Sequence, residues 1–466
     1  MQVLAMLNIL KKKDVNMLSG NITKGLVALA LPIMVMNILA SLFNIIDMTM
    51  LEKFGSDANA VGAVGVCGSL ITLMTNLVIG CATGSNVAVA KRIGAKDEEG
   101  IRRAIGTSIL FSIVGGLILT VVGVIFARTF LIWVNCSDTL LPKATVYFRL
   151  YFLGIPLNMI YSFAANVLRS SGDANRPMIF SVSGGIVKVA LTFVCTKFLH
   201  LGVEAVALAT IISWAFMAYI AVRALMKSNG TVRFELRYFR FYKKELLEIL
   251  HVGIPTGLQM VLYSFANVII TSTVNSYGTA ATTGISIANQ FDGILYNICH
   301  ATSLAVLPYV SQNVGAKNIA RAKKSIWRGV LVTTAIGGVF GALSAIFSPQ
   351  LSSLMTSDPQ VIAYSCEKMV IISSTYFICG INDIIGASVR GMGRPMLATI
   401  STLLYMCILR FFWVYLLFPL CPNFTFLYLV WPVGWVLSIL TLLLFLFPTM
   451  KRLKKKFSEQ KEAIQE

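Results

Sequence analysis

The chain has 466 residues, of which 56% are hydrophobic and 13% are charged, and its mean hydropathy is +0.77. This composition excludes an ordinary soluble domain and favours an integral membrane protein. The formal net charge is +19. The positions of the basic residues along the chain decide whether this charge indicates a nucleic-acid partner or a membrane.

Apolar stretches long enough to cross a bilayer, which takes about 20 residues, fall into two sets of six. The first set covers residues 25–52, 58–88, 104–127, 139–168, 178–199 and 203–226. The second covers residues 247–275, 281–313, 326–348, 358–389, 396–419 and 424–449. We therefore predict an all-α integral membrane protein with twelve transmembrane helices. Around them lie an N-terminal segment (1–24), a linker (227–246) and a basic tail (451–466).

Lys and Arg concentrate in segments that lie on one side of the predicted spans. These are the start of the chain, residues 91–103, 169–176, 223–244, 317–328 and 390–394, and the tail from residue 451. The loops on the other side hold only Lys53, Arg128, Lys143, Lys197 and Lys368. Basic residues accumulate in short cytoplasmic loops, so we expect a bacterial cell membrane protein with both termini in the cytoplasm. The excess charge then fits attraction to anionic membrane lipid, and no nucleic-acid partner is expected.

The two sets of spans are related by an internal repeat. At one offset Pro32 matches Pro255, Asn44 matches Asn267 and Gly55 matches Gly278, and close to it Lys188 matches Arg410. The loops agree as well: RIGAKDEEGIRRA at 92–104 pairs with NVGAKNIARAKKS at 313–325, and RSSGDANRPM at 169–178 pairs with RGMGRPM at 390–396. Each repeat holds an even number of spans, so both halves enter the membrane in the same direction. This predicts two six-helix bundles, an N-lobe (25–226) and a C-lobe (247–450), related by a pseudo-twofold axis along the membrane normal.

Ionisable residues inside the spans are the first candidates for function, because a charge in hydrocarbon is costly. They are the acids Asp47, Asp292 and Asp383 and the bases Arg149, Lys188 and Arg410. Three residues of each sign suggest ion pairs or shared cavities, and the sequence leaves the pairing open. The nine cysteines show no CxxC or Cys/His spacing, so no metal or other cofactor is expected.

Asp47 is the strongest candidate for a cation-coupling residue, with Asn44 three residues earlier on the same helical face. A carboxylate there can bind a proton reversibly or give an oxygen ligand to sodium. The alternative is a hydrogen bond between helices with a packing role only. Lys188, if it lies near, would hold the carboxylate ionised, unless the lysine itself were desolvated and neutral.

The other candidates are assigned to a substrate cavity: Asp292, Lys188, Arg410, Asn267 and Asp383. Asp292 is expected to line it and attract a cationic substrate, whereas Asp383 lies two helical turns from Arg390 and equally fits an ion pair. Lys188 and Arg410 are either cationic sites or inherited structural anchors, and Arg149 is expected to reach towards water.

Prolines interrupt several predicted helices. A static kink is expected at Pro156 and Pro308. A gating role is open at Pro32 and Pro255, because both repeats carry one there.

Four segments carry a resemblance to a known family: LALPIMVMNILASLFNIIDMTMLEKFG, GSNVAVAKRIGAKD, RSSGDANRPM and GIPTGLQMVLYSFANVIITSTVNSYG. Together and in this order they resemble the multidrug and toxic compound extrusion (MATE) transporters, most closely their DinF-like prokaryotic branch. The resemblance implies an exporter that alternates between outward-open and inward-open states, driven by a proton or sodium gradient. It also implies that Asp47 matches the coupling aspartate of the first span.

The chain departs from parts of the family in two places. Some members have a second acid in the fifth span, where this sequence has Lys188 and Thr192, and relatives of the NorM type use a glutamate in the seventh span that is absent here.

We therefore expect ion-coupled efflux of small organic compounds, cationic or amphipathic, since Met and aromatic residues suit promiscuous binding. The protein is expected to be a monomer. A flippase for a lipid-linked precursor is the alternative. A membrane-embedded enzyme ranks third, because the sequence has no HExxH or GxSxG motif, and an ATP-driven pump would need the GxxxxGK[ST] motif that is missing.

Overall fold

The computed structural model describes residues 15–54, 60–228 and 232–465, and the regular elements in these ranges are all helical. This confirms the prediction of an all-α protein. Most of the N-terminal segment, Gly55 of the repeat and residues 229–231 of the linker lie outside the described residues.

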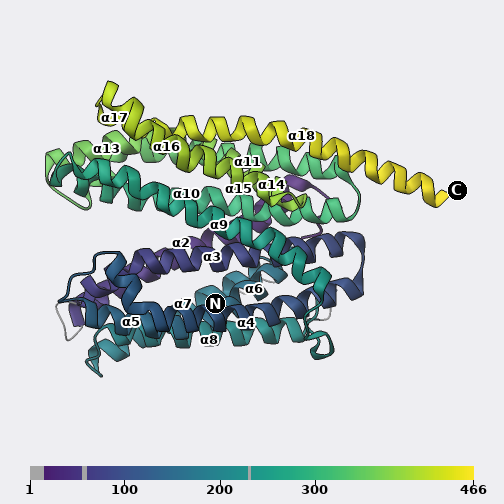
Figure 1. The fold of residues 1–466 in the computed structure, drawn as a ribbon, viewed down its shortest axis with the longest axis horizontal. Helices are drawn as coiled ribbons and strands as arrows, with labels where there is room; N and C mark the ends of the chain where they lie inside the picture. The colour runs from purple at the N-terminus through teal and green to yellow at the C-terminus, as the bar shows by residue number, and fades with distance from the viewer. Residues whose placement is uncertain (1–14, 55–59, 229–231, 466) are drawn as a thin grey trace, which may run out of the picture. The chain divides into compact units, whose positions relative to one another are not determined.

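The helices follow one another with short connections (Figure 1). The first half contains α2 (Ile22–Phe54), α3 (Ala60–Ala95), α4 (Glu98–Trp133), α5 (Leu141–Leu153), α6 (Ile155–Ser170), α7 (Asn175–Lys197) and α8 (Val203–Met226). The second half contains α9 (Lys243–Asn275), α10 (Thr279–Gly315), α11 (Ile319–Ile346), α12 (Ser348–Ser353), α13 (Pro359–Ser374), α14 (Tyr376–Gly391), α15 (Pro395–Thr402), α16 (Leu409–Phe412), α17 (Phe424–Tyr428) and α18 (Val430–Gln465).

Among the described residues, ten helices are long and apolar enough to cross a membrane, and the number is twelve if each of two bent helix pairs is one span. The pairs are α5 with α6, bent by 43°, and α13 with α14, bent by 46°. Pro156 lies in the first turn of α6, where its missing N–H costs no hydrogen bond and its ring prevents continuation from α5. The bend agrees with the kink predicted at Pro156, whereas Pro308 lies inside the unbroken α10.

Contacts divide the chain into two compact units. The first contains Val15 and residues 35–254, and the second contains residues 16–34 and the chain from Pro255 onward. The chain therefore passes between units inside α2, after Met34, and inside α9, after Ile254. The sequence predicted lobes at 25–226 and 247–450. In the structure, residues 25–34 belong instead to the second unit and residues 247–254 to the first.

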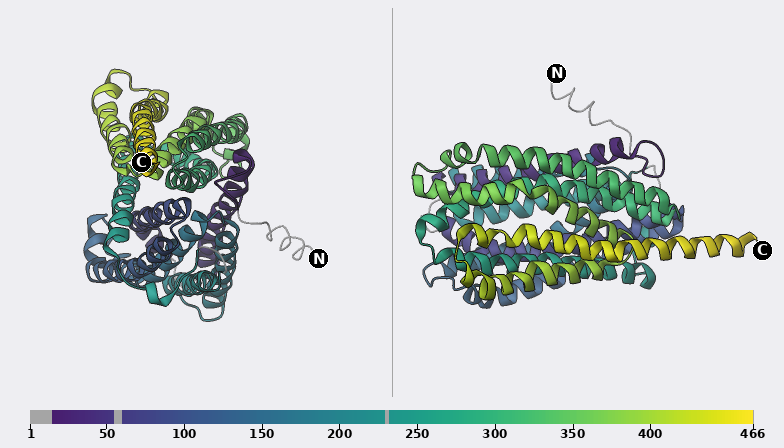
Figure 2. Two further views of the ribbon diagram at one scale, coloured as in Figure 1. Left: turned by 90° about the vertical axis from the view of Figure 1, so that its right-hand side faces the viewer. Right: turned by 90° about the horizontal axis from the view of Figure 1, so that it is seen from above.

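Within each unit the helices run side by side, which is clearest in the end-on view on the left of Figure 2. The first unit packs its helices closely because glycines replace larger side chains at contact points. A Cβ atom on Gly116 would lie 2.5 Å from Pro156 Cα, and one on Gly123 would overlap the Phe152 ring at 1.7 Å. Close approach through small residues is the usual device of helix packing in membranes.

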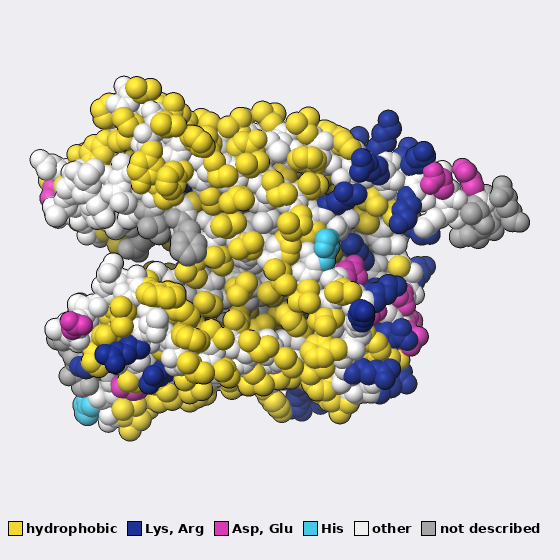
Figure 3. Space-filling view, viewed as in Figure 1, with side chains coloured by type: hydrophobic (Ala, Val, Ile, Leu, Met, Phe, Trp, Pro, Cys, Tyr) yellow, Lys and Arg dark blue, Asp and Glu magenta, His cyan; other side chains and the backbone are white. Residues whose placement is uncertain are grey.

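On the face drawn in Figure 3, each unit is apolar along its helices, and more Lys and Arg side chains lie at one end than at the other. On α4, Leu117, Ile118, Val121 and Ile125 are each more than half exposed, which suits contact with lipid tails. Lys and Arg side chains gather at the end of each unit that we call the basic end, where α3 meets α4 in the first unit and where α18 extends beyond its neighbours in the second (Figures 1 and 3). The predicted basic tail thus continues the helix α18 to Gln465.

Candidate transport site

Asp47, Asn44 and Lys188 meet in the first unit. The Asp47 side chain in α2 is buried, with 1% of the residue exposed, and its Oδ2 lies 2.6 Å from Nζ of Lys188 in α7. The same Nζ donates a hydrogen bond to Asn44 Oδ1 at 3.1 Å. The structure therefore brings together three residues that the sequence singled out separately.

The contact forms because α2 and α7 approach each other closely here. A Cβ atom on Gly185, one turn before Lys188, would lie 2.1 Å from the Phe43 ring, one turn before Asp47. Asp47 Oδ1 is buried without a hydrogen-bond partner among the described residues, as is Oγ1 of Thr192, one turn after Lys188. Buried polar atoms usually have partners, so the Asp47 oxygen is free to receive a proton, and both oxygens are free to bind a cation.

The second unit repeats two of the three members of this arrangement. Arg410 in α16, which matches Lys188, donates from Nη1 to Asn267 Oδ1 at 2.6 Å. At the offset that relates Asn44 to Asn267, Asp47 corresponds to Ile270, so the second unit has the base and the amide but an apolar residue in place of the acid. Arg410 is fully buried, and its guanidinium lies over the rings of Tyr263 (5.3 Å) and Trp431 (4.6 Å).

A cavity of about 330 Å³ opens beside Arg410 in the second unit. Its lining is rich in aromatic residues and comprises Tyr263, Asn267, Ile270, Thr271, Val274, Ile285, Asn289, Asp292, Gly293, Tyr296, Lys368, Ile372, Tyr376, Tyr428, Trp431 and Trp435. The cavity thus contains two of the predicted cavity residues, Asp292 and Asn267, and lies against a third, Arg410.

Asp292 does not carry an isolated charge. Its Oδ2 lies 2.8 Å from Nζ of Lys368, which also donates to Asn289. The prediction that Lys368 belongs to an outer loop is wrong: the residue lies inside α13 and is 4% exposed. Since α13 begins at Pro359, Lys368 is more than two turns into a helix whose apolar sequence had already been predicted to span the membrane.

Asp383 lies outside this cavity, in a small polar recess shared with Gln259 and Arg390. Its Oδ2 contacts His300 Nδ1 at 2.8 Å, and the His300 ring stacks on Tyr296 at 5.1 Å. The predicted pairing of Asp383 with Arg390 is not found among the described contacts, since Arg390 instead donates to Gln259 Oε1 at 3.0 Å. The sequence had no signal for the His300 partner, which lies on a different helix.

Arg149 is exposed, as expected for a residue that reaches towards water, and its Nε donates to the carbonyl oxygen of Val124 at 3.2 Å. Within the described ranges no three His, Cys, Asp or Glu side chains gather as metal ligands would.

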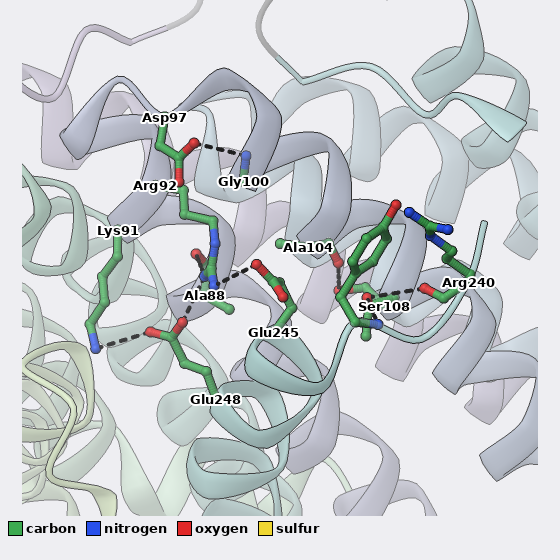
Figure 4. A network of polar contacts seen from close by, with 12 residues as sticks. Ala88, Lys91, Arg92, Asp97, Gly100, Ala104, Ser108, Arg240, Glu245 and Glu248 are labelled. Atoms are coloured by element: carbon green, nitrogen blue, oxygen red, sulfur yellow. Dashed lines mark hydrogen bonds and ion pairs between the residues drawn. The ribbon is translucent and has the colours of Figure 1, made fainter. Parts of the chain in front are cut away.

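A cluster of ion pairs at the basic end of the first unit was missed, because residues 91–103 were treated as a loop (Figure 4). Arg92, at the end of α3, contacts Glu248 at 2.6 Å and Glu245 at 3.4 Å, and Lys91 contacts Glu248 at 3.4 Å. Both glutamates lie in the first turns of α9, so the cluster fastens the start of α9 to α3. Arg92 and Glu245 are buried.

Replacing Arg92 by Met is expected to lower the free energy of unfolding by about 3–5 kcal/mol, since it leaves the buried Glu245 without its partner. The measurement is thermal unfolding of the purified protein. Lys455→Met is the control, because Lys455 pairs with Glu459 on the exposed surface of α18 at 3.8 Å and exposed pairs contribute little. Equal stability of the two variants would contradict a structural role for the cluster.

The two repeats of the chain match a known family. The MatE family model matches residues 32–194 and again 255–416, and the two matched ranges correspond to the two repeats. The chain belongs to the MATE family. It is therefore an all-helical, multi-pass membrane protein of a transporter family, not an enzyme.

Individual MATE proteins are similar along most of the chain. The probable multidrug resistance protein YoeA of Bacillus subtilis is 27% identical over 379 residues, covering 80% of this chain and 82% of YoeA. The probable multidrug resistance protein NorM of Thermotoga maritima is 26% identical, covering 84% of each chain. A solved structure described as the outward-facing conformation of a multidrug resistance MATE family transporter of the MOP superfamily has a TM-score of 0.88 at 21% identity, covering 95% of this chain and 99% of that one.

Proposed function

We propose that this MATE transporter exports small amphipathic organic molecules in exchange for a proton or sodium ion that binds at Asp47. The observation that carries the proposal is a buried carboxylate with one oxygen on Lys188 and the other without a hydrogen-bond partner in the described structure. The names of YoeA and NorM, both probable multidrug resistance proteins, support the export of varied compounds.

The ion pair explains how binding a cation changes the energy of the first unit. Asp47 and Lys188 are neutral as a pair, and a buried charge without a counterion is costly. A proton or sodium ion that takes the carboxylate displaces Lys188 Nζ, which then keeps only the Asn44 oxygen as a partner. The first unit therefore favours one arrangement of α2 and α7 with the cation bound and another without it. Alternating access requires such a difference, because a ligand shifts a conformational equilibrium only if it binds one state more tightly.

Pro32 and Pro255 are proposed as hinges for that rearrangement. Each lies inside a continuous helix, α2 or α9, and each lies within three residues of the point where the chain passes from one unit to the other. A proline removes one helical hydrogen bond, so bending there costs less than elsewhere in the helix. The gating role predicted from the repeat is consistent with this position.

The distribution of Lys and Arg supports a proposal for the orientation of the protein in the membrane. We propose that the basic end of each unit faces the bacterial cytoplasm, that the protein acts as a monomer in the cell membrane, and that it belongs to the DinF-like branch on the motifs quoted above.

The test is dye efflux from proteoliposomes of the purified protein, with a proton gradient and a sodium gradient imposed separately. Efflux under one gradient is expected, and the effective gradient identifies the coupling ion. Empty liposomes under the same gradients give the background. If no dye moves under either gradient while a fluorescent lipid-linked precursor crosses the bilayer, the flippase alternative is correct and the proposal is wrong.

A further inference from the structure

We propose that the aromatic cavity of the second unit binds planar aromatic molecules carrying an anionic group, and that Arg410 selects for the anion. The inference rests on the proposed transport function and specifies the class of substrate. It differs from the cationic substrate expected from the presence of Asp292 in the sequence.

The cavity is shaped for flat rings. Six of its lining residues are Tyr or Trp: Tyr263, Tyr296, Tyr376, Tyr428, Trp431 and Trp435. A volume of about 330 Å³ lies in the range of small-molecule sites, and aromatic walls favour a stacked or edge-on ring.

Polar groups at the cavity are left without partners, which points to a ligand. Among the described residues, Oη of Tyr428, Oδ1 of Asp292 and Nη2 of Arg410 are buried and have no hydrogen-bond partner. Tyr428 and Asp292 line the cavity, and Arg410 contacts three side chains that line it. Leaving such groups unpaired is unfavourable, so a ligand that supplies their hydrogen bonds is bound more tightly.

An organic cation is less favoured here than an anion. The charge of Asp292 is balanced by Lys368 at 2.8 Å. Three of the six rings, whose faces would attract cations, already have one from the protein: Arg410 lies over Tyr263 and Trp431, and Lys368 lies 5.8 Å from the centre of Tyr428.

An anion, by contrast, would complete the arrangement seen in the first unit. There, Lys188 has both an amide, Asn44, and a carboxylate, Asp47. In the second unit Arg410 has the amide Asn267 but no carboxylate within ion-pair distance in the described structure, and the position equivalent to Asp47 is Ile270, which lines the cavity. A carboxylate, sulfonate or phosphate of a ligand beside Ile270 and Asn267 would supply the missing charge, and the guanidinium group suits such anions.

The backbone around Arg410 is also unusual. Wide π-helical turns run from Leu403 to Ile408 and from Trp413 to Leu417, on both sides of the short α16. Such turns are rare and frequently occur at functional sites. Here they flank the four-residue helix that carries Arg410.

The test compares fluorescein, an anion, with rhodamine 123, a cation with the same three-ring core, by fluorescence polarisation on the purified protein in neutral phosphatidylcholine nanodiscs. Fluorescein is expected to bind at least about tenfold more tightly than rhodamine 123, a difference of about 1.4 kcal/mol. Empty nanodiscs give the background. Equal affinities, or tighter binding of rhodamine 123, would overturn the proposal.

Two variants test the role of Arg410. Arg410→Gln is expected to weaken fluorescein binding at least about tenfold without weakening rhodamine 123 binding. Ile270→Asp is expected to have the same effect while keeping Arg410 paired, because it copies the acid, base and amide of the first unit and so competes with the ligand anion. The exposed Arg149→Gln serves as the control with unchanged affinities. Unchanged fluorescein binding in Ile270→Asp would contradict a ligand anion beside Arg410.

These binding measurements need no ion gradient, so they separate this inference from the proposed function. Gradient-driven efflux of rhodamine 123 without fluorescein binding would support the proposed export function and contradict the proposal that the cavity binds anions. Selective fluorescein binding without efflux under any gradient would support the cavity's ligand class and count against coupled export.

Discussion

Gradient-driven dye efflux is expected to fall to background in the Asp47→Asn variant. The amide cannot take up a proton at neutral pH and carries no charge to hold sodium, so the coupling ion loses its site. The same change leaves the partly buried Lys188 without its carboxylate 2.6 Å away, which is expected to lower stability, though by less than the roughly 3–5 kcal/mol that breaking a fully buried ion pair costs. Efflux and thermal unfolding are measured on the same preparation, so that loss of transport is not confused with loss of fold.

The double variant Asp47→Asn with Lys188→Met separates these effects. Removing both charges leaves no uncompensated ion, and replacing a buried ion pair by uncharged residues is often neutral or stabilising. The double variant is therefore expected to unfold near the wild-type temperature and still to show no efflux. If it transports like the wild type, Asp47 and Lys188 form a packing contact only, which is the alternative that the sequence left open for Asp47.

The transmembrane segments could be predicted because their length and hydropathy are set by the bilayer itself. The predicted stretch 203–226 coincides with α8, and 247–275 differs from α9 only at its start, Lys243. The exchange of segments near Pro32 and Pro255 could not be predicted, since hydropathy reports that a helix lies in lipid and not which helices it packs against.

The candidate site was predictable to a different degree in each unit. The sequence places Asp47 and Asn44 on one helical face, and the repeat relates Lys188 to Arg410. These residues were therefore predicted as site candidates, but the contacts between them were not. The pairing of Asp292 with Lys368 and of Asp383 with His300 depends on helices distant in the chain. A single sequence has no signal for such pairings, although a lysine in the middle of a predicted span was a sign that Lys368 has a buried partner.

Gly84→Val is expected to destabilise the first unit strongly. A Cβ atom at Gly84 in α3 would lie 2.1 Å from the carbonyl oxygen of Ile249 and 2.9 Å from the amide nitrogen of Gly253, both in α9. These are backbone atoms, which cannot rotate away as a side chain can. Because overpacking a close contact costs 1–3 kcal/mol and sometimes more, we expect a loss of about 3 kcal/mol or more, measured as a lower thermal unfolding midpoint.

Gly68→Val is the matched control, since it makes the same substitution in the same helix, where a Cβ atom would meet nothing within 4 Å. It is expected to unfold and transport like the wild type. The contact at Gly84 holds the part of α9 before Pro255 against α3, next to the ion pairs of Arg92. If Pro255 is a hinge, that part of α9 must stay fixed while the rest moves, so Gly84→Val protein that still folds is expected to lose efflux. Wild-type stability and efflux in Gly84→Val would mean that α3 and α9 do not pack backbone against backbone, and the fixed side of the hinge would have to be sought elsewhere.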